Sequence, residues 1–166
     1  MRKIIVVIFA VALIAACTTI DCPVENTVQT HYVLKKPGGV VNDTLDTDTL
    51  WILTRRADGT DTLLLNELYD IATGFTLPIS YTQPEDVFYT LLCDTSGHKL
   101  IDTIRIKKEN YPHFESVDCQ ASYFHEITAV STTHHAFDSI VIHSSYVDYD
   151  PKKEHFYLYI KKESER

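Results

Sequence analysis

The chain has 166 residues, of which 45% are hydrophobic, and a formal net charge of −8. This length fits a single folded domain. The acidic balance argues against nucleic-acid binding, because phosphate contacts need clustered lysines and arginines, whereas the basic pairs here are scattered among acidic residues. With five glycines in the whole chain, a glycine-rich phosphate-binding loop is not expected.

The N-terminus has the features of a bacterial secretion signal. Arg2 and Lys3 form a short basic start, and the uncharged, apolar run 4–16 follows. This run is too short to span a membrane, which takes about 20 residues. It ends in Ile14-Ala15-Ala16-Cys17, which resembles the lipobox of bacterial lipoproteins. The resemblance implies cleavage before Cys17 and acylation of its sulfur, and acyl chains there would form a permanent anchor. An ordinary signal peptide is the alternative.

The residues after Cys17 bear on the destination of the protein. The stretch Thr18-Thr19-Ile20-Asp21 lacks the aspartate at the second position that retains many lipoproteins in the inner membrane, and it forms no acidic surface-export tag. We therefore expect a lipid-anchored protein of the outer membrane, on its periplasmic face. Residues 1–16 are predicted to be the signal peptide, residues 17–26 a lipid-anchored lead-in, and residues 27–166 one domain.

Besides Cys17, the chain contains Cys22, Cys93 and Cys119. The periplasm is oxidising, so a disulfide is allowed, and the odd count leaves one thiol over. Cys22 and Cys119 have polar, loop-like neighbours, whereas Cys93 ends an apolar run and is expected to be a buried strand thiol. Cys22–Cys119 is therefore the favoured pair, with three free thiols as the alternative. No CxxC pair is present, so a thioredoxin-like redox role is not expected.

Short segments rich in β-branched and aromatic residues recur along the rest of the chain. Turns are indicated by Ala57-Asp58-Gly59-Thr60 and Thr95-Ser96-Gly97-His98. Pro78 marks its segment as an edge strand or a bulge, and Asn110-Tyr111-Pro112 is expected to break the chain. Residues 66–73 are the one helix candidate. The segments expected to be strands are residues 27–35, 49–54, 61–65, 75–81, 87–93, 100–106, 123–130, 139–146 and 155–160.

Eight or nine short strands separated by turn signals predict an all-β fold. We expect an antiparallel β-sandwich rather than a closed barrel, with the immunoglobulin arrangement as one candidate. The single tryptophan, Trp51, lies in a predicted strand and is expected in the core.

The eight histidines raise the question of a metal site. His125, His134 and His143 are weak candidates, because they lie on or between adjoining predicted strands, but no zinc-type spacing supports them. Exposed or hydrogen-bonded histidines are the favoured interpretation. The Asp/Thr-rich stretches likewise lack the ligand pattern of a calcium loop. No catalytic residue is identified and no cofactor is expected, since the chain has no nucleophile elbow and no paired carboxylates in a recognisable frame.

A pattern of aspartate, then threonine or serine, then an aliphatic residue occurs five times. It resembles the O-glycosylation acceptor of Bacteroidetes envelope proteins. The alternative is that the aspartate begins a strand that the next two residues continue. The resemblance implies that the candidate acceptors, with Thr44 as the first choice, are Thr44, Thr49, Thr62, Thr103 and Ser139.

Four stretches together resemble a family of small Bacteroidetes envelope lipoproteins of unknown function. They are Cys17-Thr-Thr-Ile-Asp-Cys-Pro23 with Asn26, Phe75-Thr-Leu-Pro-Ile79, His113-Phe-Glu-Ser-Val-Asp-Cys119 and Asp138-Ser-Ile-Val-Ile142. The resemblance covers nearly the whole chain after the signal. It favours the Cys22–Cys119 pairing and an envelope location, and it carries no assigned activity.

The expected function is a non-enzymatic lipoprotein that binds an envelope protein or a glycan through one face or loop end of the sandwich. Tyrosines such as Tyr146, Tyr149, Tyr157 and Tyr159 would suit sugar stacking, although tyrosine is also an ordinary strand residue. A metal-dependent or hydrolytic enzyme on the same sandwich is one alternative. A structural or adhesin subunit is another.

Overall fold

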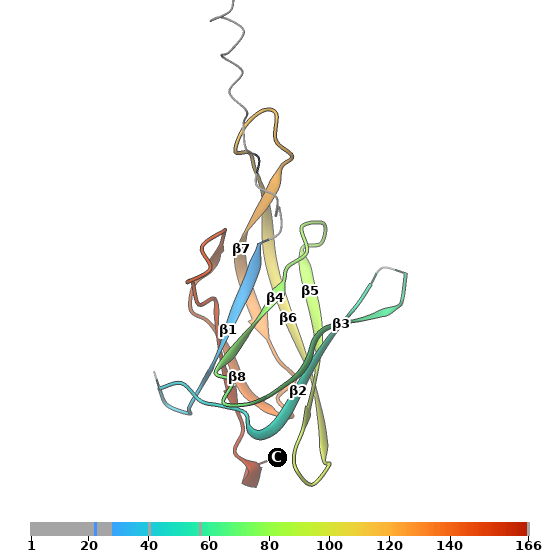
Figure 1. The fold of residues 1–166 in the computed structure, drawn as a ribbon, viewed down its shortest axis with the longest axis vertical. Coiled ribbons are helices and arrows are strands. Elements are labelled where there is room, and N and C mark those ends of the chain that lie inside the picture. The colour runs from blue at the N-terminus through green and yellow to red at the C-terminus, as the bar shows by residue number, and fades with distance from the viewer. Residues whose placement is uncertain (1–21, 23–27, 40, 57, 166) are drawn as a thin grey trace, which may run out of the picture.

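The structure, a computed structural model, describes residue 22 and residues 28–39, 41–56 and 58–165. The predicted all-β sandwich is confirmed: ten strands form two sheets that pack face to face (Figure 1). One short 3-10 turn, η1 (Glu163–Glu165), follows the last strand. The predicted signal peptide, Cys17 and all of the lead-in except Cys22 lie outside the described residues. No helix among those residues is long and apolar enough to cross a membrane.

The smaller sheet has four strands in the order β4-β1-β10-β8. They are β1 (Gln29–Lys35), β4 (Gly74–Pro78), β8 (Phe137–Ile142) and β10 (Phe156–Ile160). The first and last strands of the chain, β1 and β10, run parallel, and the other pairs of this sheet are antiparallel. Pro78 ends the edge strand β4, as its missing N–H predicts.

The larger sheet has six antiparallel strands in the order β3-β2-β5-β6-β7-β9. They are β2 (Asp46–Arg55), β3 (Asp61–Asp70), β5 (Glu85–Cys93), β6 (Lys99–His113), β7 (Ser122–Ser131) and β9 (Tyr146–Val147). The longest strand, β6, continues past the end of β5, so β6 and β7 form a hairpin that projects beyond the sandwich (Figure 1). This strand order differs from that of immunoglobulin domains, so the likeness extends to the sandwich architecture only.

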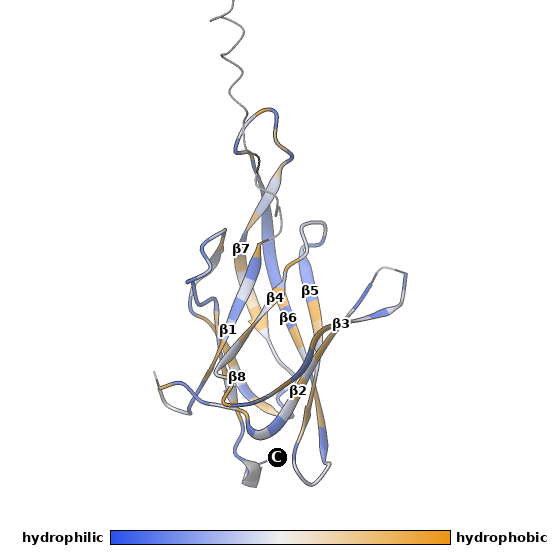
Figure 2. Cartoon of the chain, viewed as in Figure 1, coloured by the Kyte–Doolittle hydropathy of each residue, from blue (hydrophilic) through white to orange (hydrophobic). Residues whose placement is uncertain are grey.

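The core lies between the sheets and is built from alternate residues of each strand. Tyr32 is at its centre and stacks between Phe75 and Phe156, with ring centroids 4.7 and 4.8 Å apart. The larger sheet contributes residues such as Leu50 and Ile104, which are fully buried. Figure 2 shows the resulting apolar segments along the strands, interspersed with polar ones.

Both predicted turns are present, apart from Ala57, which lies outside the described residues, and each is held by an aspartate. The Asp58 carboxylate accepts a hydrogen bond from the Thr60 N–H at 2.8 Å. The Asp94 carboxylate accepts from the N–H groups of Ser96 and His98, each at 2.9 Å. Gly59 and Gly97 complete the two turns, and both have a left-handed backbone conformation that glycine adopts without strain.

The predicted helix over residues 66–73 is wrong, because β3 runs through most of it. Leu65 pairs with Ile52 and Leu68 pairs with Leu50, and the register shifts between the two pairs. Glu67, between the two leucines, has a φ of 53°. A bulge of this kind lets residues three apart point to the same side. Apolar residues three apart are also typical of one face of a helix, which explains the wrong prediction.

Three other predictions are corrected. Asn110-Tyr111-Pro112 continues β6. Proline is tolerated there because β6 pairs with β5 only as far as Lys107, so the missing N–H of Pro112 has no strand to bond on that side. Trp51 is half-buried on the outer face of the larger sheet, since Leu50 and Ile52 take the inward positions. The predicted strand 139–146 is divided, because residues 143–145 separate β8 from β9.

Candidate functional site

The projecting hairpin is joined to the N-terminal segment by a disulfide. Cys22 and Cys119 are bonded, with their Cα atoms 5.5 Å apart and a separation of 97 positions in the sequence. Cys119 lies in the loop that links β6 to β7. Cys93 is free and half-buried at the end of β5. The disulfide therefore fixes the chain leading into β1 to the hairpin end of the molecule.

The outer face of the larger sheet carries a continuous apolar surface, which we call the outer patch. Across three strands, Trp51 pairs with Leu91, which in turn pairs with Ile101. In the next row, Leu63 pairs with Leu53, which pairs with Tyr89. The outer patch thus consists of Trp51, Leu53, Leu63, Tyr89, Leu91 and Ile101. Two of its members are well exposed, Ile101 at 60% and Leu63 at 48%, and the other four are half-buried.

Charged pairs border the outer patch. Arg55 forms an ion pair with Asp61, with Nε 2.8 Å from Oδ1, and its guanidinium lies over the Tyr89 ring at 5.9 Å. Arg105 lies 3.9 Å from the Glu85 carboxylate on the adjacent strand. Such exposed pairs contribute little to stability. Their arrangement gives this face an apolar centre and a charged rim.

An aromatic cluster surrounds the base of the hairpin. His113 stacks on Phe124 with centroids 4.2 Å apart, and Tyr149 and Tyr146 approach Phe124 edge-on at 5.0 and 6.0 Å. The Tyr149 hydroxyl hydrogen-bonds to that of Ser122. Two of the four tyrosines considered for sugar stacking therefore meet at this end. Tyr157 and Tyr159 lie apart from them on β10, where His143 stacks on Tyr157 at 4.2 Å.

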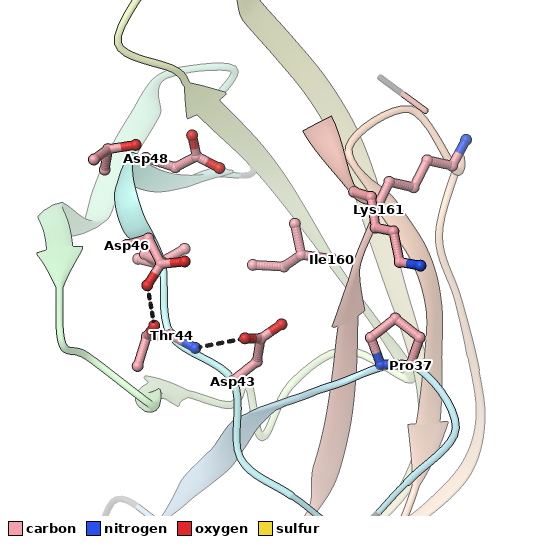
Figure 3. Close-up of a pocket in the computed structure, with 10 residues that line it drawn as sticks. Pro37, Asp43, Thr44, Asp46, Asp48, Ile160 and Lys161 are labelled. Carbon is pink, nitrogen blue, oxygen red and sulfur yellow. Dashed lines mark hydrogen bonds between the residues drawn. The ribbon is translucent and has the colours of Figure 1, made fainter. Parts of the chain in front are cut away.

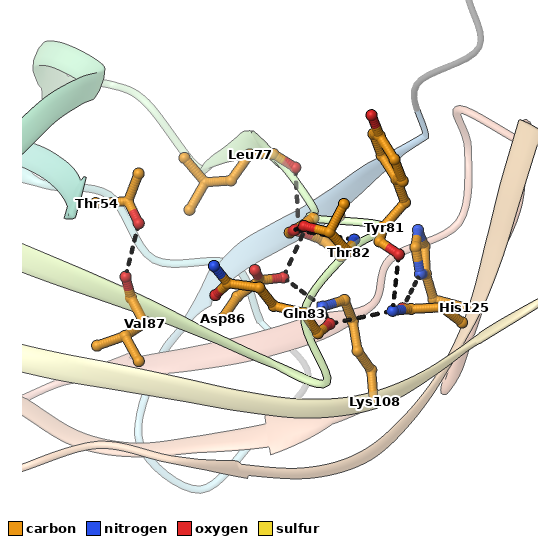
Figure 4. A network of polar contacts seen from close by, with 12 residues as sticks. Thr54, Leu77, Tyr81, Thr82, Gln83, Asp86, Val87, Lys108 and His125 are labelled. Atoms are coloured by element: carbon orange, nitrogen blue, oxygen red, sulfur yellow. Dashed lines mark hydrogen bonds and ion pairs between the residues drawn. The ribbon is translucent and has the colours of Figure 1, made fainter. Parts of the chain in front are cut away.

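A buried ion pair lies beneath the connection between β4 and β5 (Figure 4). The Lys108 ammonium is 2.9 Å from the Asp86 carboxylate, and the two side chains are 0% and 9% exposed. Lys108 also donates to the Gln83 carbonyl at 2.7 Å, and Asp86 accepts from the Ser80 N–H at 3.1 Å. Burial raises the pKa of Asp86 in spite of the lysine beside it. The pair holds the segment that crosses between the sheets.

Asn110 extends this network to His125. The Asn110 amide nitrogen donates to the carbonyls of Tyr81 and Gln83, each at 3.1 Å, so its oxygen is the acceptor for His125 Nδ1 at 2.7 Å. The proton of His125 is thus on Nδ1. Burial, together with the nearby Lys108 charge, lowers the pKa of His125 to about 4. The ring is therefore neutral at neutral pH and serves as a structural hydrogen-bond donor.

The other two histidine candidates have separate surroundings. His134 lies in the turn after β7, where its Nδ1 is 2.6 Å from the Asp138 carbonyl. His143 follows β8 and packs on Tyr157. Within the part of the chain that the structure describes, no three His, Cys, Asp or Glu side chains are grouped to hold a metal ion. The three rings are used individually.

Asp102 is a buried carboxylate on β6 that accepts its hydrogen bonds from the connection between β7 and β8. It accepts from the N–H groups of His135, Ala136 and Phe137 at 2.8, 2.6 and 2.9 Å and from the Thr133 hydroxyl at 2.6 Å. Burial alone would raise the pKa of Asp102, but these donors hold it below its ordinary value. Asp102 therefore fixes the turn between the two sheets, a role that the sequence analysis missed.

The first-choice glycosylation candidate lines a shallow pocket of about 270 Å³ between the β1–β2 connection and the end of β10 (Figure 3). Asp43, Asp46 and Asp48 also line it. The Thr44 hydroxyl donates to the Asp46 carboxylate at 2.5 Å, and the Thr44 N–H donates to that of Asp43 at 3.1 Å. These contacts explain the Asp/Thr-rich sequence as a self-bonded turn.

The other four candidate hydroxyls lie in strands. Thr49 follows the buried Asp48, and Thr103 lies between the buried Asp102 and Ile104. Ser139 is on the edge strand β8. Thr62 lies on the edge strand β3 with exposed residues on both sides. Thr62 is thus the acceptor whose three-residue pattern is most accessible in the folded chain, and its modification stays a prediction.

Comparison with known proteins yields one match. Residues 49–160 match DUF6452, a family of unknown function, and this region includes the outer patch, the hairpin and the Lys108–Asp86 pair. No curated protein and no solved structure matches the chain. Because the match spans more than half of the sequence, the chain belongs to the DUF6452 family.

Proposed function

We propose that this protein is a lipid-anchored lipoprotein of the bacterial cell envelope that binds a protein partner through the outer patch. The anchor and the outer-membrane, periplasmic location rest on the sequence: a basic start, a short apolar run and the lipobox-like Ile14-Ala15-Ala16-Cys17. The resemblance to small Bacteroidetes lipoproteins supports the same location. The binding role rests on the outer patch.

The outer patch has the make-up of a protein-binding surface. Six apolar side chains from four neighbouring strands lie side by side, and Trp51 and Tyr89 are of the residue types that dominate binding energy at interfaces. The ion pairs around them correspond to the polar rim of an interface. A large exposed apolar patch with a polar border is a common mark of an interaction site.

The geometry favours a protein over a glycan or a small substrate. The outer patch lies on the face of a sheet, whereas small-molecule sites are concave. Glycan stacking needs free ring faces, and His113 and His143 each cover one face of Phe124 and of Tyr157, respectively. The buried polar groups, such as Asp102 and Lys108, are engaged in holding loops. These observations support a non-enzymatic role.

Site-specific photo-crosslinking tests this proposal in native membranes. A benzoylphenylalanine at Ile101, in the outer patch, is compared with one at Val141, which is 42% exposed on the other sheet. We expect a defined cross-linked protein from position 101 that position 141 does not give. Adding Leu63→Asp, which places a charge in the patch, should abolish that product. Equal products at both positions, or none at position 101, would contradict the proposal.

A further inference from the structure

The tip of the β6–β7 hairpin is the end of the molecule opposite the C-terminus (Figure 1). Beyond Lys107 the hairpin no longer pairs with β5, and its two strands stay paired as far as His113 and Ser122. Residues 114–121 form the tip. The tip thus extends along the long axis of the molecule, past the layers of the sandwich.

This tip exposes large apolar side chains. Phe114 is 62% exposed and Val117 is 97% exposed, and Tyr111 below them is 45% exposed. Figure 2 shows apolar segments around the loop. Single exposed apolar residues are common on proteins. Phe114 and Val117 are different because the disulfide joins their loop to the N-terminal segment that would carry the lipid.

The length of chain between the lipid and the disulfide limits where the tip can be. Cys22 follows Cys17 by five residues, which span at most about 18 Å when fully extended. Cys119, in the tip, is 5.5 Å from Cys22 between Cα atoms. An acylated Cys17 lies at the membrane surface. The tip is therefore held within a short distance of the lipid headgroups.

We propose that the hairpin tip is a second membrane contact, in which Phe114 and Val117 enter the interfacial layer of the bilayer that holds the acylated Cys17. This inference rests on the lipid anchor of the proposed function. Aromatic residues with a wet polar end are typical of membrane interfaces, and Tyr111 and Tyr149 are placed below the tip in that role. The contact would hold the sandwich upright and turn its outer patch sideways.

The acidic residues of the tip determine which lipid headgroups it can contact. Glu115 and Asp118 are exposed beside the apolar residues, and Glu115 is paired with His113 at 3.0 Å. An acidic tip is repelled by anionic headgroups. We therefore expect the tip to prefer zwitterionic headgroups, and added phosphatidylglycerol to weaken the contact.

Tryptophan fluorescence in proteoliposomes tests the contact. The chain has one tryptophan, so Trp51→Phe with Phe114→Trp places a single reporter at the tip. The control reporter is Ile71→Trp in the same Trp51→Phe chain, which replaces an 80% exposed residue in the β3–β4 turn. That turn is beside the far end of β1, since the Thr73 carbonyl accepts from the Leu34 N–H. The full acylated chain is bound to phosphatidylethanolamine and phosphatidylcholine vesicles that carry brominated acyl chains.

We expect blue-shifted emission at position 114 and quenching several-fold stronger than at position 71. Flotation of the vesicles is measured in the same samples. A chain that does not float overturns the lipid anchor and the tip contact together. A chain that floats, with equal quenching at the two positions, overturns the tip contact and leaves the anchor intact. Emission at position 114 that is neither blue-shifted nor quenched would mean that the tip faces solvent or binds a protein instead.

Discussion

Gly74 shows how closely single residues are fitted where β4 meets β1. A Cβ at this position would lie 2.3 Å from the Tyr32 carbonyl oxygen, which is backbone and cannot move aside. We expect Gly74→Ala to lower the free energy of unfolding by about 1–3 kcal/mol, measured by urea denaturation. Gly39→Ala is the matched control, because its nearest atom would be 3.9 Å away. Equal effects of the two substitutions would contradict this assignment.

His155 makes stability depend on pH. Its ring is fully buried, and its Nδ1 accepts from the His31 N–H at 3.0 Å. Burial and the charge of His31 lower its pKa to about 4. The pKa of an unfolded histidine is about 6.5, so the unfolded chain binds more protons than the folded chain between these two values. Stability is therefore lost as pH falls from about 6.5 to about 4. His125 acts in the same direction.

The variant His155→Asn isolates this effect, since an asparagine oxygen can replace Nδ1 as acceptor without titrating. Its free energy of unfolding should fall less between pH 7 and pH 4.5 than that of the wild type, by up to about 2–3 kcal/mol. His98→Asn changes an exposed histidine and should keep the wild-type slope. If His155→Asn also keeps that slope, His155 is not the titrating group.

At the scale of elements, two neighbouring lysines on β6 carry the same charge but differ in burial, since Lys108 is buried and Lys107 is exposed. Lys108→Met leaves the buried Asp86 without its partner and should cost roughly 3–5 kcal/mol of unfolding free energy. Lys107→Met alters the exposed neighbour on the opposite face and should cost little. Adding Asp86→Leu to Lys108→Met should restore most of the loss. A small effect of Lys108→Met alone would show that Asp86 is protonated and needs no partner.

Much of the fold was predictable because its signals are local. Alternating apolar residues predicted most of the strands, and the glycine-containing stretches at Gly59 and Gly97 predicted the two turns. The errors arose where the outcome depends on a distant strand. The bulge in β3 gave Leu65 and Leu68 a helical spacing. Trp51 lies in a strand that is apolar on both faces, so the sequence does not determine which face turns inward.

The candidate site was harder to predict than the fold. The outer patch joins residues of four strands, and only the register brings Trp51 beside Leu91 and Ile101. The sequence was misleading at β6, since the apolar Ile101 is exposed and the charged Asp102 beside it is buried, the reverse of the usual pattern. The disulfide was easier, because the polar neighbours of Cys22 and Cys119 set them apart from Cys93.

At the scale of the whole molecule, the disulfide closes most of the domain into one loop. Cys22→Ala with Cys119→Ala should lower the free energy of unfolding by about 4–5 kcal/mol in the chain-entropy treatment, because the bond spans 97 residues. Cys93→Ala, which removes the half-buried free thiol, should change it far less. A double variant as stable as the wild type would mean that the N-terminal segment is held by other contacts.

The molecule has a long axis with different properties at its ends and sides. One end carries the disulfide and the projecting tip, and the other carries the C-terminus (Figure 1). The outer patch lies on the outer face of the larger sheet. A lipid at Cys17 would orient this axis relative to the membrane, because it would place the tip toward the bilayer and leave the outer patch free for a partner.

The mass of the mature protein purified from native membranes tests the anchor, on which this arrangement depends. We expect a chain that begins at Cys17 and carries a diacylglyceryl group, and a Cys17→Ala variant that keeps residues 1–16 and carries no lipid. A mature wild-type chain that begins at another residue, or that begins at Cys17 without a lipid, would contradict it.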